Sequence, residues 1–214
     1  MNKYTNYFKE HYRYNFSENN LKTYYKWFYS QFNIINKKLK IDYNKQILEI
    51  GSAIGGFYNF VKTDNYIGLE LDKDAVEFAN TIFNKNLFKN ISFEEFITDK
   101  KFDYIFSFEV LEHMDNPDLN IQKIHDILND DGKFIGTSPY PFLKNIFADK
   151  THKYVLHPES WKRLFVKAGF KNVQIIPMSF LPLIWRFNKK INIRMPFYVP
   201  FKNFVSTCLI IASK

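Results

Sequence analysis

Three residues that can bind a metal ion or move a proton follow one mostly apolar stretch of the sequence, residues 102–108. They are Glu109, Glu112 and His113, in the pattern E-x-x-E-H. If the chain turns helically there, the three side chains point to one side, because positions three and four apart share a helix face. Two carboxylates and an imidazole on one face could hold a divalent cation such as Mg²⁺, Mn²⁺ or Fe²⁺.

A later histidine, His152 in the segment DKTHKYVLHP, could complete this group. Its imidazole could equally act as a general base toward a hydroxyl, since histidine titrates near neutral pH. Both interpretations stay open at the level of sequence. His157, next to Pro158, is expected to begin a helix and not to bind a ligand.

A second pattern indicates a nucleotide-binding crevice. Residues 47–57, ILEIGSAIGGF, read as an apolar strand that runs into a glycine-bearing turn, and residues 66–72, YIGLELD, read as a strand ending in an acid. That acid, Glu70, comes nineteen residues after Gly51. In such a crevice the glycines let the backbone approach the ligand, and the acid accepts hydrogen bonds from ribose hydroxyls.

The glycine spacing indicates which nucleotide is bound. Glycines at 51, 55 and 56 do not meet the G-x-G-x-x-G pattern that seats a pyrophosphate at a helix N-terminus. The segment instead resembles motif I of class I S-adenosylmethionine-dependent methyltransferases, E/D-x-G-x-G-x-G. Ala53 stands where that family usually has its middle glycine, so we expect a small local shift and not a loss of binding.

Later segments resemble the same family in the same order, from about residue 45 to the C-terminus: residues 101–114, 127–141 and 158–176. The resemblance implies an α/β, Rossmann-like, seven-stranded methyltransferase sheet. Its strands would be mostly parallel, with an antiparallel last strand and helices on both faces. We expect strands at about 46–50, 66–71, 90–93, 102–108, 133–138, 171–176 and 205–212. Helices are expected at about 55–63, 73–84, 117–129 and 158–168, with Asp72, Pro117 and Gly169 at helix ends.

The resemblance also implies that the cofactor is S-adenosylmethionine. Glu70 would accept both ribose hydroxyls, and Glu94 or Glu95 would lie beside the adenine. The residues after Gly51 would wrap the methionine end, where Glu49 suits the sulfonium cation. The full cofactor-binding set is Glu49, Gly51, Ser52, Ala53, Gly55, Glu70, Leu71, Glu94, Glu95 and Phe108.

The E-x-x-E-H pattern with a later H-K-Y resembles the metal site of methyltransferases that modify the 3′-terminal 2′-hydroxyl of small RNAs. E-x-x-E-H alone is similar to the ubiquinone-biosynthesis O-methyltransferases, which also use a divalent ion. The pattern is also frequent in relatives without metal, where the first Glu is structural and the His lines the pocket or acts as a base. The expected catalytic residues are Glu109, His113 and His152, and the expected metal ligands are Glu109, Glu112, His113 and His152.

Oxygen is the expected methyl acceptor. The N/D-P-P-Y signature of amide N-methyltransferases is absent, and Cys208, the single cysteine, falls in the last expected strand and not at a nucleophile position. The leading hypothesis is an O-methyltransferase for a small anionic or sugar-like molecule, such as a polysaccharide precursor. The alternatives are an RNA ribose 2′-O-methyltransferase and a non-catalytic methyltransferase-like partner protein, against which motif I and Glu70 argue.

Charge is unevenly distributed along the chain. No acid follows Glu159, whereas ten Lys and Arg lie between Ser160 and Lys214. Residues 177–204 combine these cations with aromatic residues and are expected to form a basic, aromatic lid at the substrate mouth. Such a lid would favour an anionic acceptor, RNA or an anionic membrane surface, although a solvated basic face would look the same.

We expect a single domain over residues 1–214. It would comprise an N-terminal helical cap (1–44), a core (45–176), the basic lid (177–204) and the last strand (205–212). No apolar run approaches the roughly 20 residues of a membrane span, and the first residues lack the apolar core of a signal peptide. With one cysteine no intramolecular disulfide can form, so a cytoplasmic location is expected. The sequence leaves the oligomeric state open.

Overall fold

The computed structural model describes residues 22, 32, 35, 36, 39–141, 149–180, 194, 195 and 205–214. They belong to two compact units, residues 1–97 and residues 98–214, and each is described by itself. Most of the expected helical cap (1–44) and most of the expected basic lid (177–204) lie outside the described residues.

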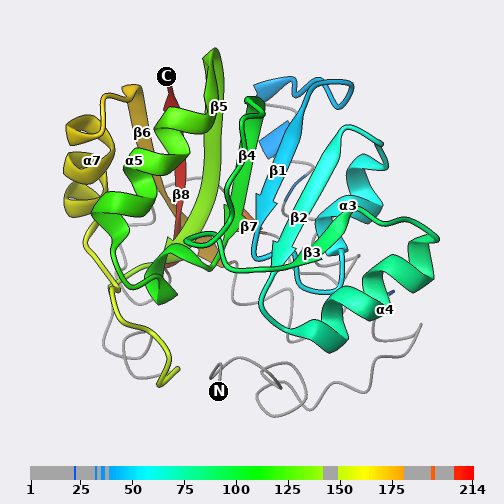
Figure 1. The fold of residues 1–214 in the computed structure, drawn as a ribbon. Helices are drawn as coiled ribbons and strands as arrows, with labels where there is room; N and C mark the ends of the chain where they lie inside the picture. Colours follow the sequence, from blue (N-terminus) through cyan, green and yellow to red (C-terminus); the bar gives the residue numbers. More distant parts are fainter. Residues whose placement is uncertain are drawn as a thin grey trace. The chain divides into compact units, whose positions relative to one another are not determined.

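The first unit contains three parallel strands, β1 (Ile47–Ile50), β2 (Tyr66–Glu70) and β3 (Phe88–Asn90), with β2 in the middle. Helix α3 (Gly56–Val61) follows β1, and α4 (Lys73–Phe83) follows β2. Figure 1 shows the three strands side by side, and α4 contacts β2 and β3. Parallel pairing needs a crossover between strands, and both helices supply one.

Aromatic side chains fill the space around these strands. Phe57, Tyr58, Tyr66 and Phe88 are all buried. Tyr58 lies edge-on to Phe88, with ring centroids 5.5 Å apart, and Tyr66 is tilted against Phe88 at 5.6 Å. Such edge-to-face contacts add to the free energy gained by burying large rings.

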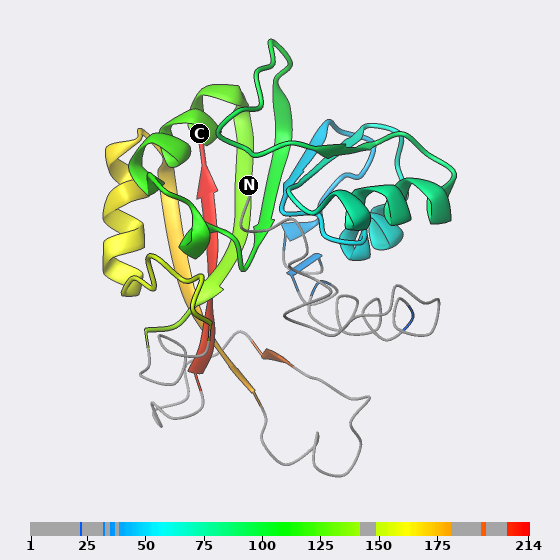
Figure 2. The ribbon, with the colours of Figure 1, turned by 60° about the horizontal axis from the view of Figure 1, so that its bottom comes forward.

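The second unit contains parallel β4 (Phe102–Phe108) and β5 (Leu128–Pro139), then β8 (Val205–Ser213) and β6 (Lys171–Phe180). Strand β8 is antiparallel to both β5 and β6, and Figure 2 shows β6 and β8 running side by side. A two-residue strand, β7 (Arg194–Met195), pairs with the end of β6.

Two helices of the second unit, α5 (Pro117–Ile127) and α7 (Pro158–Lys167), contact each other and the sheet. Trp161 and Phe165 of α7 are fully buried, and Phe165 packs against Phe134 of β5 with ring centroids 5.0 Å apart. His157 is the N-cap of α7, and its Nδ1 accepts the backbone N–H of Glu159 at 3.4 Å. The expected role of His157 at a helix start is thereby confirmed.

The expected fold class is confirmed: parallel strands joined by helices, followed by an antiparallel last strand. The helix ends at Asp72, Pro117 and Gly169 are also as predicted, since Asp72 accepts two backbone N–H groups and Gly169 has φ +96°. Strand β5 begins earlier than expected, at Leu128, because the chain becomes extended immediately after α5. None of the helices among the described residues is long and apolar enough to cross a membrane.

Candidate functional site

The glycine turn after β1 has an unusual backbone. Gly51, Ala53 and Gly55 all have positive φ, at 77°, 48° and 81°. Alanine is strained in this region because its Cβ crowds the backbone, and glycine is not. A Cβ at Gly55 would also lie 2.6 Å from Phe83 and 2.9 Å from Phe88. The turn therefore keeps its shape although one of its three left-handed positions carries a methyl group.

The carboxylate of Glu70 holds this turn from the end of β2. Its Oε2 accepts the backbone N–H of Ala53 at 2.9 Å. Its Oε1 accepts the N–H groups of Leu71 at 2.7 Å and Asp72 at 2.9 Å. Burial raises the pKa of Glu70 although these three donors act to lower it. A carboxylate has about four acceptor positions, so accepting two ribose hydroxyls requires release of one backbone N–H.

Glu49 lies beneath the turn, 1% exposed, and accepts a hydrogen bond from the Tyr66 hydroxyl. Burial raises the pKa of Glu49 to about 8, against the lowering effect of Tyr66 and with a smaller raising contribution from Glu70. The group is therefore mostly neutral at pH 7. The attraction for a sulfonium that the sequence suggested would require this proton to leave.

Sequence reasoning missed Tyr66 and Gly68 as parts of this site. A Cβ at Gly68, which is paired with Glu49, would lie 2.8 Å from the Ser52 side chain and 2.8 Å from the Tyr66 hydroxyl. A glycine inside a strand pattern signals such a close approach, so the clue was present in the sequence.

The remaining residues of the first unit that the sequence predicts to bind the cofactor follow β3. Glu94 and Glu95 are both exposed. Glu95 Oε2 accepts the Ser92 hydroxyl at 3.0 Å, and Ser92 in turn accepts the backbone N–H of Glu95 at 3.1 Å. In the second unit, Phe108 is half-buried at the end of β4, and its ring stacks on Phe106 at a centroid distance of 6.0 Å.

Glu109 follows β4 in a left-handed conformation, with φ 56°, and its N–H donates to the Thr137 carbonyl at 3.0 Å. Its Oε1 accepts the Thr207 hydroxyl at 2.6 Å. The chain does not turn helically through Glu109, because it first passes through this left-handed conformation and only then forms a 3₁₀ turn, η1 (Leu111–His113). Glu109 therefore does not share one helix face with Glu112 and His113.

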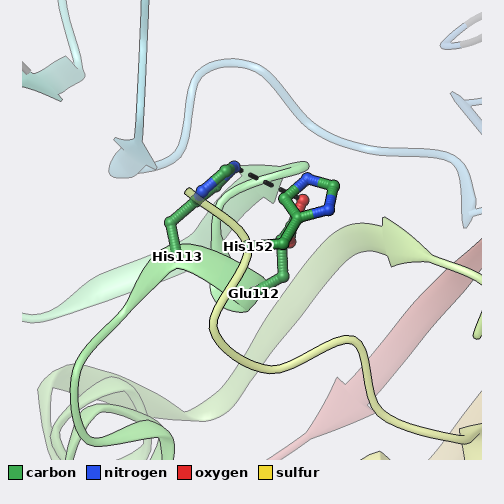
Figure 3. Close-up of side chains that lie close together, drawn as sticks. All are labelled: Glu112, His113 and His152. Carbon is green, nitrogen blue, oxygen red and sulfur yellow. Dashed lines mark ion pairs between the residues drawn. The ribbon is translucent and has the colours of Figure 1, made fainter. Parts of the chain in front are cut away.

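Three of the four expected acid and imidazole side chains converge. Glu112, His113 and His152 each offer one ligand atom, and these atoms all lie within 4.8 Å of one another (Figure 3). His113 Nε2 lies 3.8 Å from Glu112 Oε1, and the two imidazole rings have centroids 4.9 Å apart. We name these three residues the EHH cluster.

Glu112 is the one member of the EHH cluster that is fully buried in the protein. Neither of its carboxylate oxygens accepts a well-formed hydrogen bond from the described residues, although the Ser138 hydroxyl lies near enough to favour the charged form. Burial raises the pKa of Glu112 well above its ordinary value, and the negative charge of Glu109 raises it further. A buried carboxylate short of donors, beside two imidazoles, fits a divalent cation.

The segment that carries His152 is tied to the 3₁₀ turn. The Glu112 carbonyl accepts the backbone N–H groups of Lys153 at 2.8 Å and Tyr154 at 3.0 Å. The Lys153 ammonium pairs with the Asp115 carboxylate, and the Tyr154 hydroxyl donates to the Asp115 carbonyl at 3.1 Å. These contacts explain how residues so far apart in the sequence come together at the EHH cluster.

Comparisons with known proteins bear on the family and the fold. A family model described as a methyltransferase domain matches residues 29–175. A search of curated proteins found no match. The structure is similar to a Thermotoga maritima protein described as a SAM-dependent methyltransferase and possible histamine N-methyltransferase. Identity is 20%, the alignment covers 100% of both chains and the TM-score is 0.73.

Two further solved structures share the fold. A SAM-dependent methyltransferase from Archaeoglobus fulgidus is 21% identical over 89% of this chain and 100% of its own, with a TM-score of 0.64. Phosphoethanolamine N-methyltransferase 2 of Haemonchus contortus, solved with S-adenosylmethionine, is 14% identical over 100% of this chain and 60% of its own, with a TM-score of 0.68. The chain belongs to the methyltransferase domain family, and its fold is shared by solved S-adenosylmethionine-dependent methyltransferases.

Proposed function

We propose that this protein is an O-methyltransferase that transfers the methyl group of S-adenosylmethionine to a hydroxyl of a small anionic or sugar-like acceptor. The observation that carries the proposal is the EHH cluster, in which one buried carboxylate and one imidazole from the turn after β4 meet the imidazole of His152. A hydroxyl must lose its proton to accept a methyl group, and these side chains are suited to remove that proton.

The first unit supplies all but one of the cofactor-binding residues in this proposal; the exception is Phe108 of the second unit. Glu70 holds the turn from Gly51 to Gly55 through the backbone N–H of Ala53, so this turn lies next to a carboxylate that can accept ribose hydroxyls. The complete proposed cofactor set is Glu49, Gly51, Ser52, Ala53, Gly55, Glu70, Leu71, Glu94, Glu95 and Phe108.

Methyl transfer from a sulfonium is an in-line displacement. The acceptor oxygen forms a bond to the methyl carbon, the carbon–sulfur bond breaks, and its electron pair stays on sulfur as a neutral thioether. The acceptor proton passes to a base, which we propose to be His113 or His152. The protein's remaining task is to orient the acceptor, which can lower the barrier substantially.

A divalent cation is the alternative partner for the EHH cluster. Glu112, His113 and His152 would hold it, because each offers one ligand atom and the Glu112 oxygens are short of donors. Glu109 lies close enough to influence Glu112, although its carboxylate is engaged by Thr207. A bound Mg²⁺, Mn²⁺ or Fe²⁺ would lower the pKa of an acceptor hydroxyl.

The acceptor class can be tested by incubating the full chain with methyl-labelled S-adenosylmethionine and a panel of acceptors. The panel comprises nucleotide-linked sugars, sugar phosphates, small amines, and short RNA ending in a 3′-terminal ribose with or without its 2′-hydroxyl. The proposal expects label on an oxygen of a sugar or phosphate-bearing compound. Label on the amines alone, the acceptor class named for two of the similar structures, would contradict oxygen as the acceptor.

RNA ribose is the second candidate acceptor. The pattern Glu109-x-x-Glu112-His113, followed by His152, Lys153 and Tyr154, favours it through its likeness to the small-RNA enzymes. The basic composition of residues 177–204 is compatible with phosphate contacts. Label on RNA that depends on the terminal 2′-hydroxyl would establish this alternative over the small-molecule proposal.

A further inference from the structure

His113 is held by a short relay of side chains that the proposed mechanism does not use. Its Nδ1 lies 3.0 Å from the Thr151 hydroxyl oxygen and 3.2 Å from the Thr151 carbonyl oxygen. The Thr151 hydroxyl in turn lies 2.6 Å from Asp149 Oδ1. The same Asp149 oxygen accepts the backbone N–H of Thr151 at 2.8 Å, and Asp149 is 8% exposed.

The chemistry of these groups fixes where the hydrogens lie. A carbonyl oxygen can only accept, so its contact requires a hydrogen on His113 Nδ1. The Asp149 carboxylate also has no hydrogen to give, so the Thr151 hydroxyl donates to Asp149. That leaves the Thr151 oxygen as a second acceptor for His113 Nδ1–H. Both contacts therefore favour the same tautomer of the His113 ring.

We propose that Asp149 and Thr151 are positioning residues that hold His113 as its Nδ1–H tautomer and present its Nε2 lone pair to the EHH cluster. Nε2 is the atom that lies 3.8 Å from Glu112 Oε1, on the side of the ring where His152 also lies (Figure 3). The lone pair is the feature that a general base and a metal ligand both need. The inference rests on the proposed function only for the use of that lone pair.

The ring nitrogens can be observed directly by long-range ¹H–¹⁵N correlation spectroscopy on the labelled full chain. The measurement is made without cofactor or acceptor, at about pH 8, above the ordinary imidazole pKa of about 6.5. A His113→Gln variant identifies the His113 signals by their loss. We expect the wild-type ring to show the Nδ1–H pattern, and an Nε2–H pattern in the wild type would overturn the proposal without any variant.

Variants then test the relay. Thr151→Val removes the hydroxyl but keeps the side-chain shape, and should raise the ratio of Nε2–H to Nδ1–H about 2- to 10-fold, as expected for the loss of one neutral hydrogen bond. Thr151→Ser should restore the wild-type ratio. Asp149→Ala should act in the same direction as Thr151→Val, because the hydroxyl hydrogen is then free to turn toward Nδ1.

A matched control is Thr98→Val, which removes a hydroxyl that accepts the backbone N–H of Lys100 and lies outside the EHH cluster. It should leave the His113 signals unchanged. An unchanged tautomer ratio in folded Thr151→Val would overturn the role of Thr151. Because the measurement uses the protein alone, the His113 tautomer can be established even if O-methylation is disproved. An unexpected tautomer would likewise leave the proposal of O-methylation untouched.

Discussion

The Glu70 carboxylate accepts the backbone N–H of Ala53 at 2.9 Å, and so joins the end of β2 to the turn that follows β1. The residue that would recognise a ribose therefore also fixes the backbone around the methionine end of the proposed ligand. Ala53 is held there at φ 48°, a conformation that costs alanine free energy. Cofactor affinity and the stability of the first unit are consequently linked through this pair.

Replacing Ala53 with glycine should stabilise the protein. The left-handed conformation costs alanine about 1–2 kcal/mol, and the extra freedom of unfolded glycine costs about 0.5–1 kcal/mol, so the expected net gain is about 0.5–1 kcal/mol. Denaturant unfolding measures this change. The matched control, Ala79→Gly inside α4, should lose about 1 kcal/mol or more. Equal losses in the two variants would show that the Ala53 conformation is not strained.

The buried acid Glu49 should make stability fall as pH rises. Its folded pKa of about 8 lies above its ordinary value of 4.5, so the folded state holds a proton that the unfolded state has already released in this window. Stability attributable to this group is therefore full below about pH 4.5 and is lost toward pH 8, by at most about 1.4 kcal/mol per pH unit. The Glu49→Gln variant should lack this loss. Parallel stability–pH curves for wild type and variant would contradict the assignment.

The histidines of the EHH cluster should be required for turnover. We expect His113→Ala and His152→Ala to lower kcat by about 10²- to 10⁴-fold, the usual range for loss of a general base. The control is His157→Asn, which keeps a good N-cap on α7 and should retain activity. Full activity in His152→Ala would remove this residue from the mechanism.

Chelation separates the two chemistries of the EHH cluster. If a metal is bound, EDTA should abolish activity, Mg²⁺ or Mn²⁺ should restore it, and Glu112→Gln should be as damaging as His152→Ala. If a histidine acts alone as the base, activity should survive EDTA and Glu112→Gln should be the milder change. The kcat measured with and without EDTA for each variant decides between them.

The basic segment 177–204, most of which lies outside the described residues, should contact an anionic acceptor. Neutralising its cations should raise the acceptor KM and flatten the dependence of KM on salt, while cofactor affinity stays unchanged. The four substitutions to Gln are at Arg186, Lys189, Lys190 and Arg194. The control set of exposed lysines changed to Gln is Lys62, Lys73, Lys89 and Lys100. An unchanged acceptor KM at low salt would reduce the segment to a solvated face.

Much of the fold could be predicted from the sequence because its signals are local. The alternation of apolar strands and helices located nearly every element, and Asp72 and Pro117 marked helix starts through ordinary capping chemistry. The left-handed conformation of Glu109 could not be predicted, because it depends on hydrogen bonds to Thr137 and Thr207, which are distant in sequence.

The candidate site could likewise be predicted only in part, where its signals are local in the sequence. The pattern Glu112–His113 is contiguous, and its likeness to known motifs pointed to His152. No sequence motif marks the relay through Asp149 and Thr151. It is recognised only in the folded structure, where residues 149–151 lie against the 3₁₀ turn that carries His113. The raised pKa of Glu49 likewise follows from the burial of its carboxyl group, which outweighs the lowering effect of the Tyr66 hydroxyl and which no local pattern encodes.

Calorimetric titration with S-adenosylmethionine tests the central claim most directly, with thermal unfolding confirming that each variant is folded. The wild type should bind, and Glu70→Ala should bind about 10- to 150-fold more weakly, as expected for loss of a charge-assisted hydrogen bond worth about 1.5–3 kcal/mol. The control Glu77→Ala, an exposed carboxylate on α4, should bind as the wild type does. Unchanged affinity in folded Glu70→Ala, or no binding to the wild type, would contradict the account.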